Sequence, residues 1–266
     1  MSILGNLKRK KSAGQTDREG TIGKDLDFSA AEAYKRLRTN LMFSFSGDES
    51  CHVIGITSSL RGEGKSTTSM NLAYTLAEAG KRVLLIDADM RLPQAHAILN
   101  LHQTPGLSNV LVGENNGANL IQPSGIQQNL HILTAGDISP NPTELLGSRR
   151  LVGMLDSLKP RYDYIVIDLP PVGAVADALI VSKLTSGMVI VVRQNFVEKA
   201  VLENTITQLR YHKANILGFV ENYAEGEGGY YQKRYYRKEG YYYYRKEDKE
   251  KDKSKDKDTE QAESET

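Results

Sequence analysis

The sequence predicts an α/β fold in which a mostly parallel sheet is flanked by helices on both faces. Short runs of apolar, often β-branched residues alternate along the chain with longer helical patterns. Each run is apolar at nearly every position, which is typical of strands buried on both faces of a parallel sheet. Helical segments between the runs provide the crossovers that parallel strands require.

Six apolar runs have the length of a buried strand. In chain order they are Val53–Thr57, Val83–Asp87, Leu130–Thr134, Tyr164–Asp168, Met188–Val192 and Ile216–Val220. Helices fit before and between them at Ala30–Phe43, Lys65–Ala79, Pro142–Leu158, Ala176–Leu184 and Glu198–Tyr211. In the first helix, Ala33, Leu37 and Leu41 are spaced to share one face.

The two ends of the chain differ from this central domain, which we place at residues 29–223. Residues 1–28 are predicted to be a flexible basic arm, since the first 20 hold five basic side chains against two acidic ones. No Leu, Ile, Val, Met or Phe follows Val220, so residues 224–266 are expected to be disordered. This tail ends in a mixed-charge extension, residues 247–266.

The tail also holds most of the tyrosines. Eight of the 14 lie within residues 230–244: Tyr230, Tyr231, Tyr235, Tyr236, Tyr241, Tyr242, Tyr243 and Tyr244. Six basic residues and one acidic residue accompany them in residues 230–246. Exposed, clustered phenols gain nothing from burial, so they are candidate sites of modification.

Several classes of protein are excluded by composition. The single cysteine, Cys51, excludes a disulfide scaffold, and the five histidines lack the spacing of metal ligands. No apolar run approaches the roughly 20 residues of a membrane helix. We therefore expect a soluble intracellular protein.

A phosphate-binding loop follows the first strand. Successive backbone N–H groups of Gly62, Glu63, Gly64 and Lys65 would face an anion, aided by the start of the next helix. The lysine would reach the outer phosphates, and Ser66, followed by Thr67, offers a hydroxyl for Mg²⁺. The first glycine of G-x-x-x-x-G-K-[ST] is replaced by Ser59. The sequence thus predicts a P-loop nucleotide-binding protein.

Carboxylates stand at the ends of two further strands, where open parallel sheets bind ligands. Asp87 and Asp89 follow one strand, and Asp168 ends another in IVIDLPP, which resembles a Walker B strand. One carboxylate must hold the metal that bridges two phosphates. Another could take the proton of a tyrosine hydroxyl. Together with the tyrosine-rich tail, this suggests an enzyme that phosphorylates itself.

These motifs resemble those of the bacterial tyrosine kinases of capsule and exopolysaccharide synthesis. GEGKST matches the family's Walker A, LLIDADMR its Walker A′ and IVIDLPP its Walker B, while the terminal tyrosines match its phosphorylated cluster. EAYKRLRTN resembles the family's oligomerisation helix, with Glu32, Lys35 and Arg38 as interface residues. The resemblance covers about residues 28–244.

The resemblance implies an ATP- and Mg²⁺-dependent protein-tyrosine kinase that regulates capsular or exopolysaccharide polymerisation and export. It implies phosphorylation of the tail in trans within a homo-oligomeric ring, an octamer in the family, and reversal by a cognate tyrosine phosphatase. A separate transmembrane activator would complete the nucleotide site through its cytoplasmic tail. The kinase itself would be cytoplasmic and recruited to the inner face of the membrane.

Site roles follow from the same resemblance. Lys65 and Ser66 would hold phosphate and metal, Asp89 and Asp168 would position Mg²⁺, and Asp87 is the candidate base. The division of work between the first two aspartates stays open. Asn222, at the end of the last strand, is a candidate contact of the adenine.

The chain departs from the family pattern at three positions. Arg61 stands where the loop commonly has proline, and Lys35 replaces an arginine of the oligomerisation helix, so it lacks the planar fork of that residue. Glu221 stands where the last strand usually has an apolar residue.

Parts of the sequence also fit two other functions. A partitioning ATPase of the ParA or MinD type shares the sheet, but its signature loop lysine is replaced here by Leu60. The Tyr/Arg/Lys tail could instead bind nucleic acid by stacking and phosphate contacts. We expect no specific nucleic-acid partner.

Overall fold

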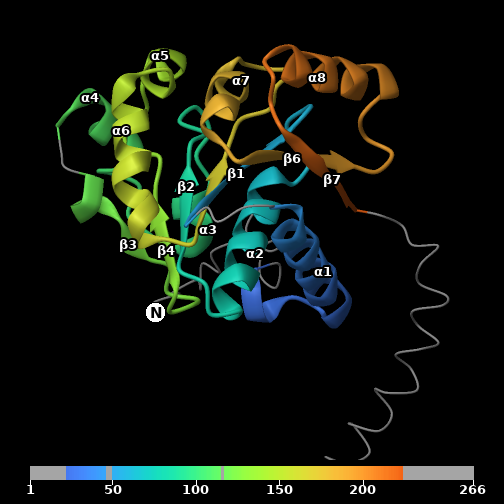
Figure 1. The fold of residues 1–266 in the computed structure, drawn as a ribbon, viewed down its shortest axis with the longest axis horizontal. Helices are drawn as coiled ribbons and strands as arrows, with labels where there is room; N and C mark the ends of the chain where they lie inside the picture. The colour runs from blue at the N-terminus through green and yellow to red at the C-terminus, as the bar shows by residue number, and fades with distance from the viewer. Residues whose placement is uncertain (1–21, 46–49, 115–116, 224–266) are drawn as a thin grey trace, which may run out of the picture. The chain divides into compact units, whose positions relative to one another are not determined.

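The computed structural model describes residues 22–45, 50–114 and 117–223, which include all of the central sheet (Figure 1). Its seven strands lie in the order β3-β4-β2-β5-β1-β6-β7. They are β1 (His52–Ser58), β2 (Val83–Asp87), β3 (Gln122–Pro123), β4 (Leu130–Leu133), β5 (Tyr164–Asp168), β6 (Gly187–Arg193) and β7 (Ile216–Asn222). All neighbouring strands are parallel except β3 and β4. The predicted α/β class is confirmed.

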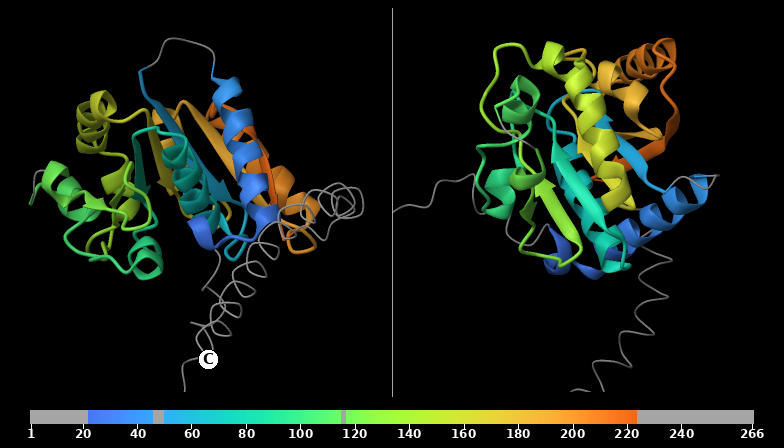
Figure 2. Two further views of the ribbon diagram at one scale, coloured as in Figure 1. Left: turned by 90° about the horizontal axis from the view of Figure 1, so that it is seen from below. Right: turned by 60° about the vertical axis from the view of Figure 1, so that its left-hand side comes forward.

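Helices cover both faces of the sheet (Figures 1 and 2). The α-helices are α1 (Phe28–Ser44), α2 (Lys65–Glu78), α3 (Ala95–Leu99), α4 (Leu107–Val112), α5 (Pro142–Leu146), α6 (Arg149–Leu158), α7 (Asp177–Val181) and α8 (Lys199–Tyr211). Short 3₁₀ turns span Gly23–Asp25, Gly117–Leu120, Lys159–Arg161 and Ser182–Leu184. None of the described helices is long and apolar enough to cross a bilayer.

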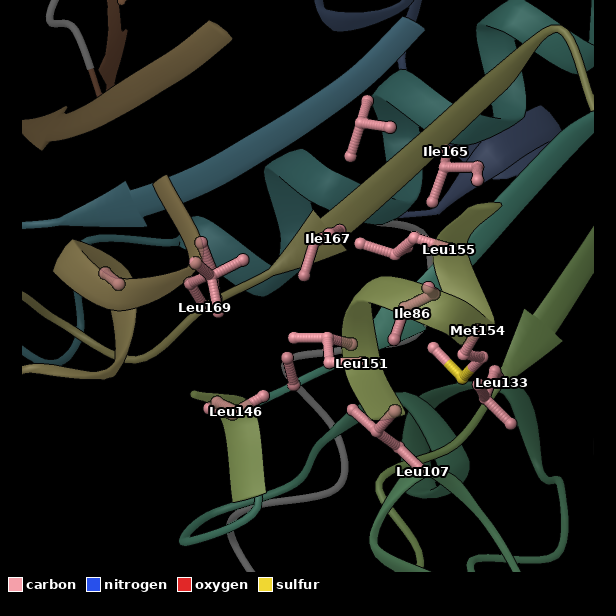
Figure 3. Close-up of a cluster of buried hydrophobic side chains, with 14 of the residues drawn as sticks. Ile86, Leu107, Leu133, Leu146, Leu151, Met154, Leu155, Ile165, Ile167 and Leu169 are labelled. Carbon is pink, nitrogen blue, oxygen red and sulfur yellow. The ribbon is translucent and has the colours of Figure 1, made fainter. Parts of the chain in front are cut away.

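Alternate side chains of the central strands enter two separate cores, which explains why these strands are almost entirely apolar. Ile54 and Ile56 of β1 pack against α1 and α2, whereas Val53 belongs to the opposite core. Figure 3 shows part of that second core, where Leu151, Met154 and Leu155 of α6 lie near residues of β2, β4 and β5.

Four local predictions need correction. The segment 142–158 is not one helix, because Gly147 and Ser148 separate α5 from α6. The α-helix predicted over 176–184 covers only α7 and continues as a 3₁₀ turn. Leu37 and Leu41 pack on the α2 side as expected, but Ala33 is exposed. Finally, β3, α3 and α4 were not predicted, since each is short and lacks a clear period.

The folded region begins earlier than the predicted boundary at residue 29. The backbone N–H of Gly23 donates to Asn71 Oδ1 of α2 at 2.9 Å, and Ile22 packs into the core on that side. The first 21 residues and the tail from residue 224 lie outside the described residues, so their predicted disorder stays a prediction.

Candidate functional site

The phosphate-binding loop connects β1 to α2 at the carboxyl edge of the sheet. Gly62 and Gly64 have φ of 88° and 90°, a left-handed conformation that glycine adopts without steric cost. Lys65 is the first residue of α2, and Ser66 and Thr67 follow it in the first turn. Arg61 is exposed at the outside of the loop. The sequence prediction of strand, loop and helix is therefore matched by the geometry.

Glu63 holds this loop in position. Its side chain is fully buried, and its carboxylate accepts hydrogen bonds from the backbone N–H groups of Leu60 at 2.6 Å and Arg193 at 3.1 Å. Asn222 Nδ2 donates to the Glu63 carbonyl oxygen at 3.0 Å. Glu63 thus fastens the loop to the end of β6 through its carboxylate and to the end of β7 through its carbonyl oxygen.

Lys65 lies among the predicted carboxylates. Its Nζ is 2.9 Å from Asp89 Oδ2 and 3.9 Å from Asp168 Oδ1, and it also approaches Ser66 Oγ at 3.4 Å. Burial on its own lowers the pKa of Lys65, but the carboxylates of Asp168 and Asp89 outweigh that effect and raise it. The ammonium is therefore held charged at the point where the outer phosphates of a nucleotide would arrive.

Asp168 and Asp87 lie opposite each other in the register of β5 and β2. Burial raises the pKa of Asp168, opposed by the Lys65 ammonium and by hydrogen bonds from Ser66 and Ser69. The Ser69 hydroxyl, one turn beyond Lys65, lies 3.2 Å from Asp168 Oδ1. Sequence reasoning did not single out Ser69, although its i+4 spacing from Lys65 places it on the same helix face.

Asp87 is fully buried and supports the segment that follows β2. Its Oδ2 accepts from the backbone N–H groups of Gln94 and Ala95 at 3.0 and 2.9 Å, and its Oδ1 accepts from that of Asp89 at 3.2 Å. Burial, reinforced by the nearby Asp168 charge, raises the pKa of Asp87 to about 7. The backbone donors and Lys65 oppose this shift without cancelling it.

A raised carboxyl pKa predicts a pH-dependent stability effect of Asp87→Asn. Between the unfolded pKa near 4 and the folded pKa near 7, the folded state binds the extra proton, so wild-type stability falls as pH rises. Asparagine does not titrate. As pH rises from 5 to 7.5, the free energy of unfolding of the variant should therefore increase relative to that of wild type by up to about 3 kcal/mol. Urea unfolding in EDTA measures this difference.

Asp163→Asn is the matched control for that measurement. A hydrogen bond from Arg82 lowers the pKa of Asp163, so its stabilising effect is lost only as pH falls below the tested window. The free energy of unfolding of Asp163→Asn should therefore differ from that of wild type by the same amount at every pH between 5 and 7.5. An equally constant difference for Asp87→Asn would contradict the raised pKa.

A second ion-pair network, which the sequence alone hardly indicates, holds the segment that follows β2. Arg91 Nε lies 3.4 Å from Asp177 Oδ2, and Arg91 Nη2 donates to Thr143 Oγ1 at 3.0 Å. Asp177 is fully buried at the start of α7. Only the arginine belongs to a motif visible in the sequence, D-x-D-x-R. This network joins the segment carrying Asp89 to α5 and α7.

The remaining predicted site residues lie elsewhere. On α1, Lys35 Nζ pairs with Glu32 Oε1 at 2.9 Å, and Arg38 Nη1 donates to the Thr75 carbonyl oxygen of α2 at 2.9 Å. The eight tyrosines of residues 230–244 lie outside the described residues. Glu221 is exposed on β7. Both ends of the Asn222 amide are engaged, since its Oδ1 accepts from the Tyr223 N–H at 3.0 Å.

The residues present fit a magnesium nucleotide. The buried hydroxyl of Ser59, at the start of the loop, has no hydrogen-bond partner among the described residues. The described residues contain no group of three His, Cys, Asp or Glu side chains that could hold a metal alone. Mg²⁺ commonly binds through one or two carboxylates together with substrate phosphates. Asp89, Asp168 and Ser66 can supply that incomplete set.

Comparisons with known proteins agree with this geometry. A family model described as an AAA domain matches residues 51–216. The tyrosine-protein kinase YwqD of Bacillus subtilis is 38% identical over 205 residues, which cover 76% of this chain and 86% of YwqD. The crystal structure of the chimerical protein CapA2B2 superimposes with a TM-score of 0.73 at 34% identity, covering 79% of this chain and 91% of that chain.

A second group of solved structures is more distant. The septum site-determining protein MinD of Pyrococcus horikoshii, solved with Mg-ADP, has a TM-score of 0.57 at 27% identity. The match covers 66% of this chain and 72% of that chain. A similar fold therefore also occurs in a septum site-determining protein.

Proposed function

The chain belongs to the family of bacterial tyrosine-protein kinases, and on that premise we propose that it transfers the γ-phosphate of ATP to the tyrosine cluster of residues 230–244 in a second copy. One observation carries this proposal most directly. Lys65 sits between Asp89 and Asp168 at the end of a phosphate-binding loop, in a chain whose tail supplies eight clustered phenols.

The proposed roles follow from the contacts. The backbone N–H groups of Gly62 to Lys65 bind the phosphates together with the Ser66 and Thr67 region, and the Lys65 ammonium neutralises charge that develops in transfer. Ser66, Asp89 and Asp168 would hold Mg²⁺, which neutralises phosphate charge when bound. Mg²⁺ and ATP are the proposed cofactors.

Asp87 is the proposed base for the tyrosine hydroxyl. A carboxylate pKa near 7 suits proton transfer at neutral pH, whereas an unperturbed carboxylate is a weaker base. Of its two oxygens, Oδ1 has the single and longer hydrogen bond, at 3.2 Å to the Asp89 N–H. That oxygen is the one with capacity for an incoming proton.

The wider function is proposed from the family. The kinase would regulate capsular or exopolysaccharide polymerisation and export, at the inner face of the membrane. Its partners would be a transmembrane activator that contributes a cytoplasmic tail to the site, and a cognate tyrosine phosphatase. Homo-oligomerisation through the α1 face around Glu32, Lys35 and Arg38 would bring one copy's tail to its neighbour's site, in a ring such as an octamer.

Intact mass measurement tests the reaction. After incubation with ATP and Mg²⁺, we expect added steps of about 80 Da on the wild-type chain. A variant with all eight tyrosines of residues 230–244 changed to phenylalanine should gain none. Where an activator tail is required, a peptide from the transmembrane partner is added to every sample.

A mixing experiment separates transfer in trans from transfer within one chain. Lys65→Met protein keeps its tyrosines but lacks the ammonium, and the eight-phenylalanine variant keeps its site but lacks acceptors. If transfer occurs in trans, the Lys65→Met chain gains mass in the mixture and not alone. If neither chain gains mass in the mixture, although wild type alone does, transfer in trans is refuted.

The similarity to MinD gives a second candidate, a partitioning ATPase. Leu60 occupies the position of the signature lysine of those proteins, which weighs against it. Measurable ATP turnover without any mass gain, with the activator peptide present, would favour this second function.

A further inference from the structure

Arg193, the last residue of β6, touches the phosphate-binding loop at two points. Its backbone N–H donates to Glu63 Oε2 at 3.1 Å, and its guanidinium Nη1 donates to the Gly62 carbonyl oxygen at 3.4 Å. In the register of the sheet, Arg193 pairs with Asn222, which binds the Glu63 carbonyl oxygen. Two neighbouring strand ends therefore both hold Glu63, and Arg193 also holds Gly62.

Two aromatic rings hold the guanidinium in place. The Cζ atom of Arg193 lies 4.8 Å from the ring centroid of Phe196 and 4.4 Å from that of Tyr223. Both rings are substantially exposed, at 45% and 63% of their possible surface. A cation stacked on an aromatic ring is attracted to it at exposed sites as well as at buried ones, so both rings favour this position of the guanidinium.

The same rings lie against the loop glycines. A Cβ atom on Gly62 would meet Phe196 Cζ at 3.7 Å, and one on Gly64 would have Tyr223 Cε2 at 3.9 Å. Arg193, Phe196 and Tyr223 thus form one assembly, here called the loop clamp, over the side of the loop that faces β6 and β7. None of these three residues supplies a phosphate-binding N–H group in the proposed mechanism.

We propose that Arg193 is a positioning residue for nucleotide binding, kept in place by Phe196 and Tyr223. Glycine-rich loops lose more conformational freedom on ordering than other segments. A contact that orders the loop before the nucleotide arrives removes part of that cost from the binding step. The inference rests on the proposed nucleotide site but not on the identity of the phosphate acceptor.

Binding of a fluorescent ADP analogue, mant-ADP, with Mg²⁺ to the full chain tests the proposal. Arg193→Ala should weaken binding by about tenfold, because a charge-assisted hydrogen bond and both stacking contacts are lost. Arg193→Lys should recover little, since lysine lacks the planar fork that bonds and stacks together. Phe196→Leu and Tyr223→Leu should each cost about two- to fivefold.

Tyr223→Phe is the conservative rescue, since it keeps the ring and should bind mant-ADP as wild type does. Arg210→Ala, an exposed arginine near the end of α8, controls for loss of positive charge. A positioning role requires a higher Kd, and a higher KM for ATP, with unchanged binding stoichiometry and a kcat close to wild type. Tm without nucleotide is measured for every variant.

Three results would overturn the proposal. They are an unchanged Kd for Arg193→Ala, equal losses for Tyr223→Phe and Tyr223→Leu, or reduced stoichiometry at unchanged Kd. If Arg193→Ala does not fold, the two leucine variants at exposed positions decide the matter through their Kd values. Because mant-ADP binding needs no phosphate acceptor, the Kd values can be compared even if the chain shows no kinase activity.

Discussion

Replacing Lys65 by methionine is expected to reduce phosphate transfer to the tail tyrosines by at least about 100-fold. The Lys65 ammonium is the cation that lies 2.9 Å from Asp89 and 3.9 Å from Asp168, in a site nine-tenths buried. Methionine has a similar volume but no charge, so it can neither contact the phosphates nor balance the carboxylates. Initial rates of mass gain, with saturating ATP and Mg²⁺, measure the effect.

The same change should also lower the stability of the protein without nucleotide. Breaking a buried ion pair by removing one partner typically costs about 3–5 kcal/mol, because a buried charge is left uncompensated. Protonation of Asp87, whose pKa is about 7, relieves part of that cost, so the loss of stability should be larger at pH 8 than at pH 6. Lys159→Met is the control, since it removes an exposed lysine paired with Asp156. Transfer rates within threefold of wild type for Lys65→Met would refute the assigned role.

How much of the fold the sequence predicts depends on how strongly each segment is buried. The strands β1, β2, β4, β5 and β6 are mostly buried apolar runs, and their positions follow from this pattern. The edge strand β7 is only partly buried, but its run Ile216–Val220 is still apolar enough to be predicted. The two-residue β3 contains Pro123 and has no apolar run, so only its pairing with β4 reveals it. Likewise, Gly147 and Ser148 break a helix pattern whose apolar spacing continues on both sides.

The candidate site likewise contains residues that the sequence predicts and residues that it does not. Lys65, Asp87, Asp89 and Asp168 were predicted because motifs at strand ends converge in any open parallel sheet. Ser69 and Asp177 were missed, because their importance depends on which side chains approach them from distant segments. Glu63 was predicted as a loop residue, but its burial and its bond to Arg193, 130 positions away, could not be read from its neighbours in sequence.

Gly64→Ala is expected to have the second large effect, with nucleotide affinity reduced at least about 100-fold. A Cβ atom at this position would lie 1.9 Å from Asn222 Nδ2, and the backbone φ of +90° is itself unfavourable for alanine. Asn222 cannot easily move aside, because its amide bonds both the Glu63 carbonyl oxygen and the Tyr223 N–H. The loop must therefore shift, and its N–H groups with it. Titration with mant-ADP and Mg²⁺ measures the loss.

Two matched variants separate the clash from the backbone strain. Gly80 has a similar φ of +81°, but a Cβ atom there would meet nothing within 4 Å. Gly80→Ala therefore carries only the conformational cost, on the order of 1 kcal/mol, and should bind nucleotide normally. In the double variant Gly64→Ala, Asn222→Ala the obstructing amide is gone, so part of the affinity should return. If Gly64→Ala lowers affinity as much in the Asn222→Ala background as in the wild-type background, the clash is not the cause, and the left-handed backbone of Gly64 alone sets the requirement for glycine.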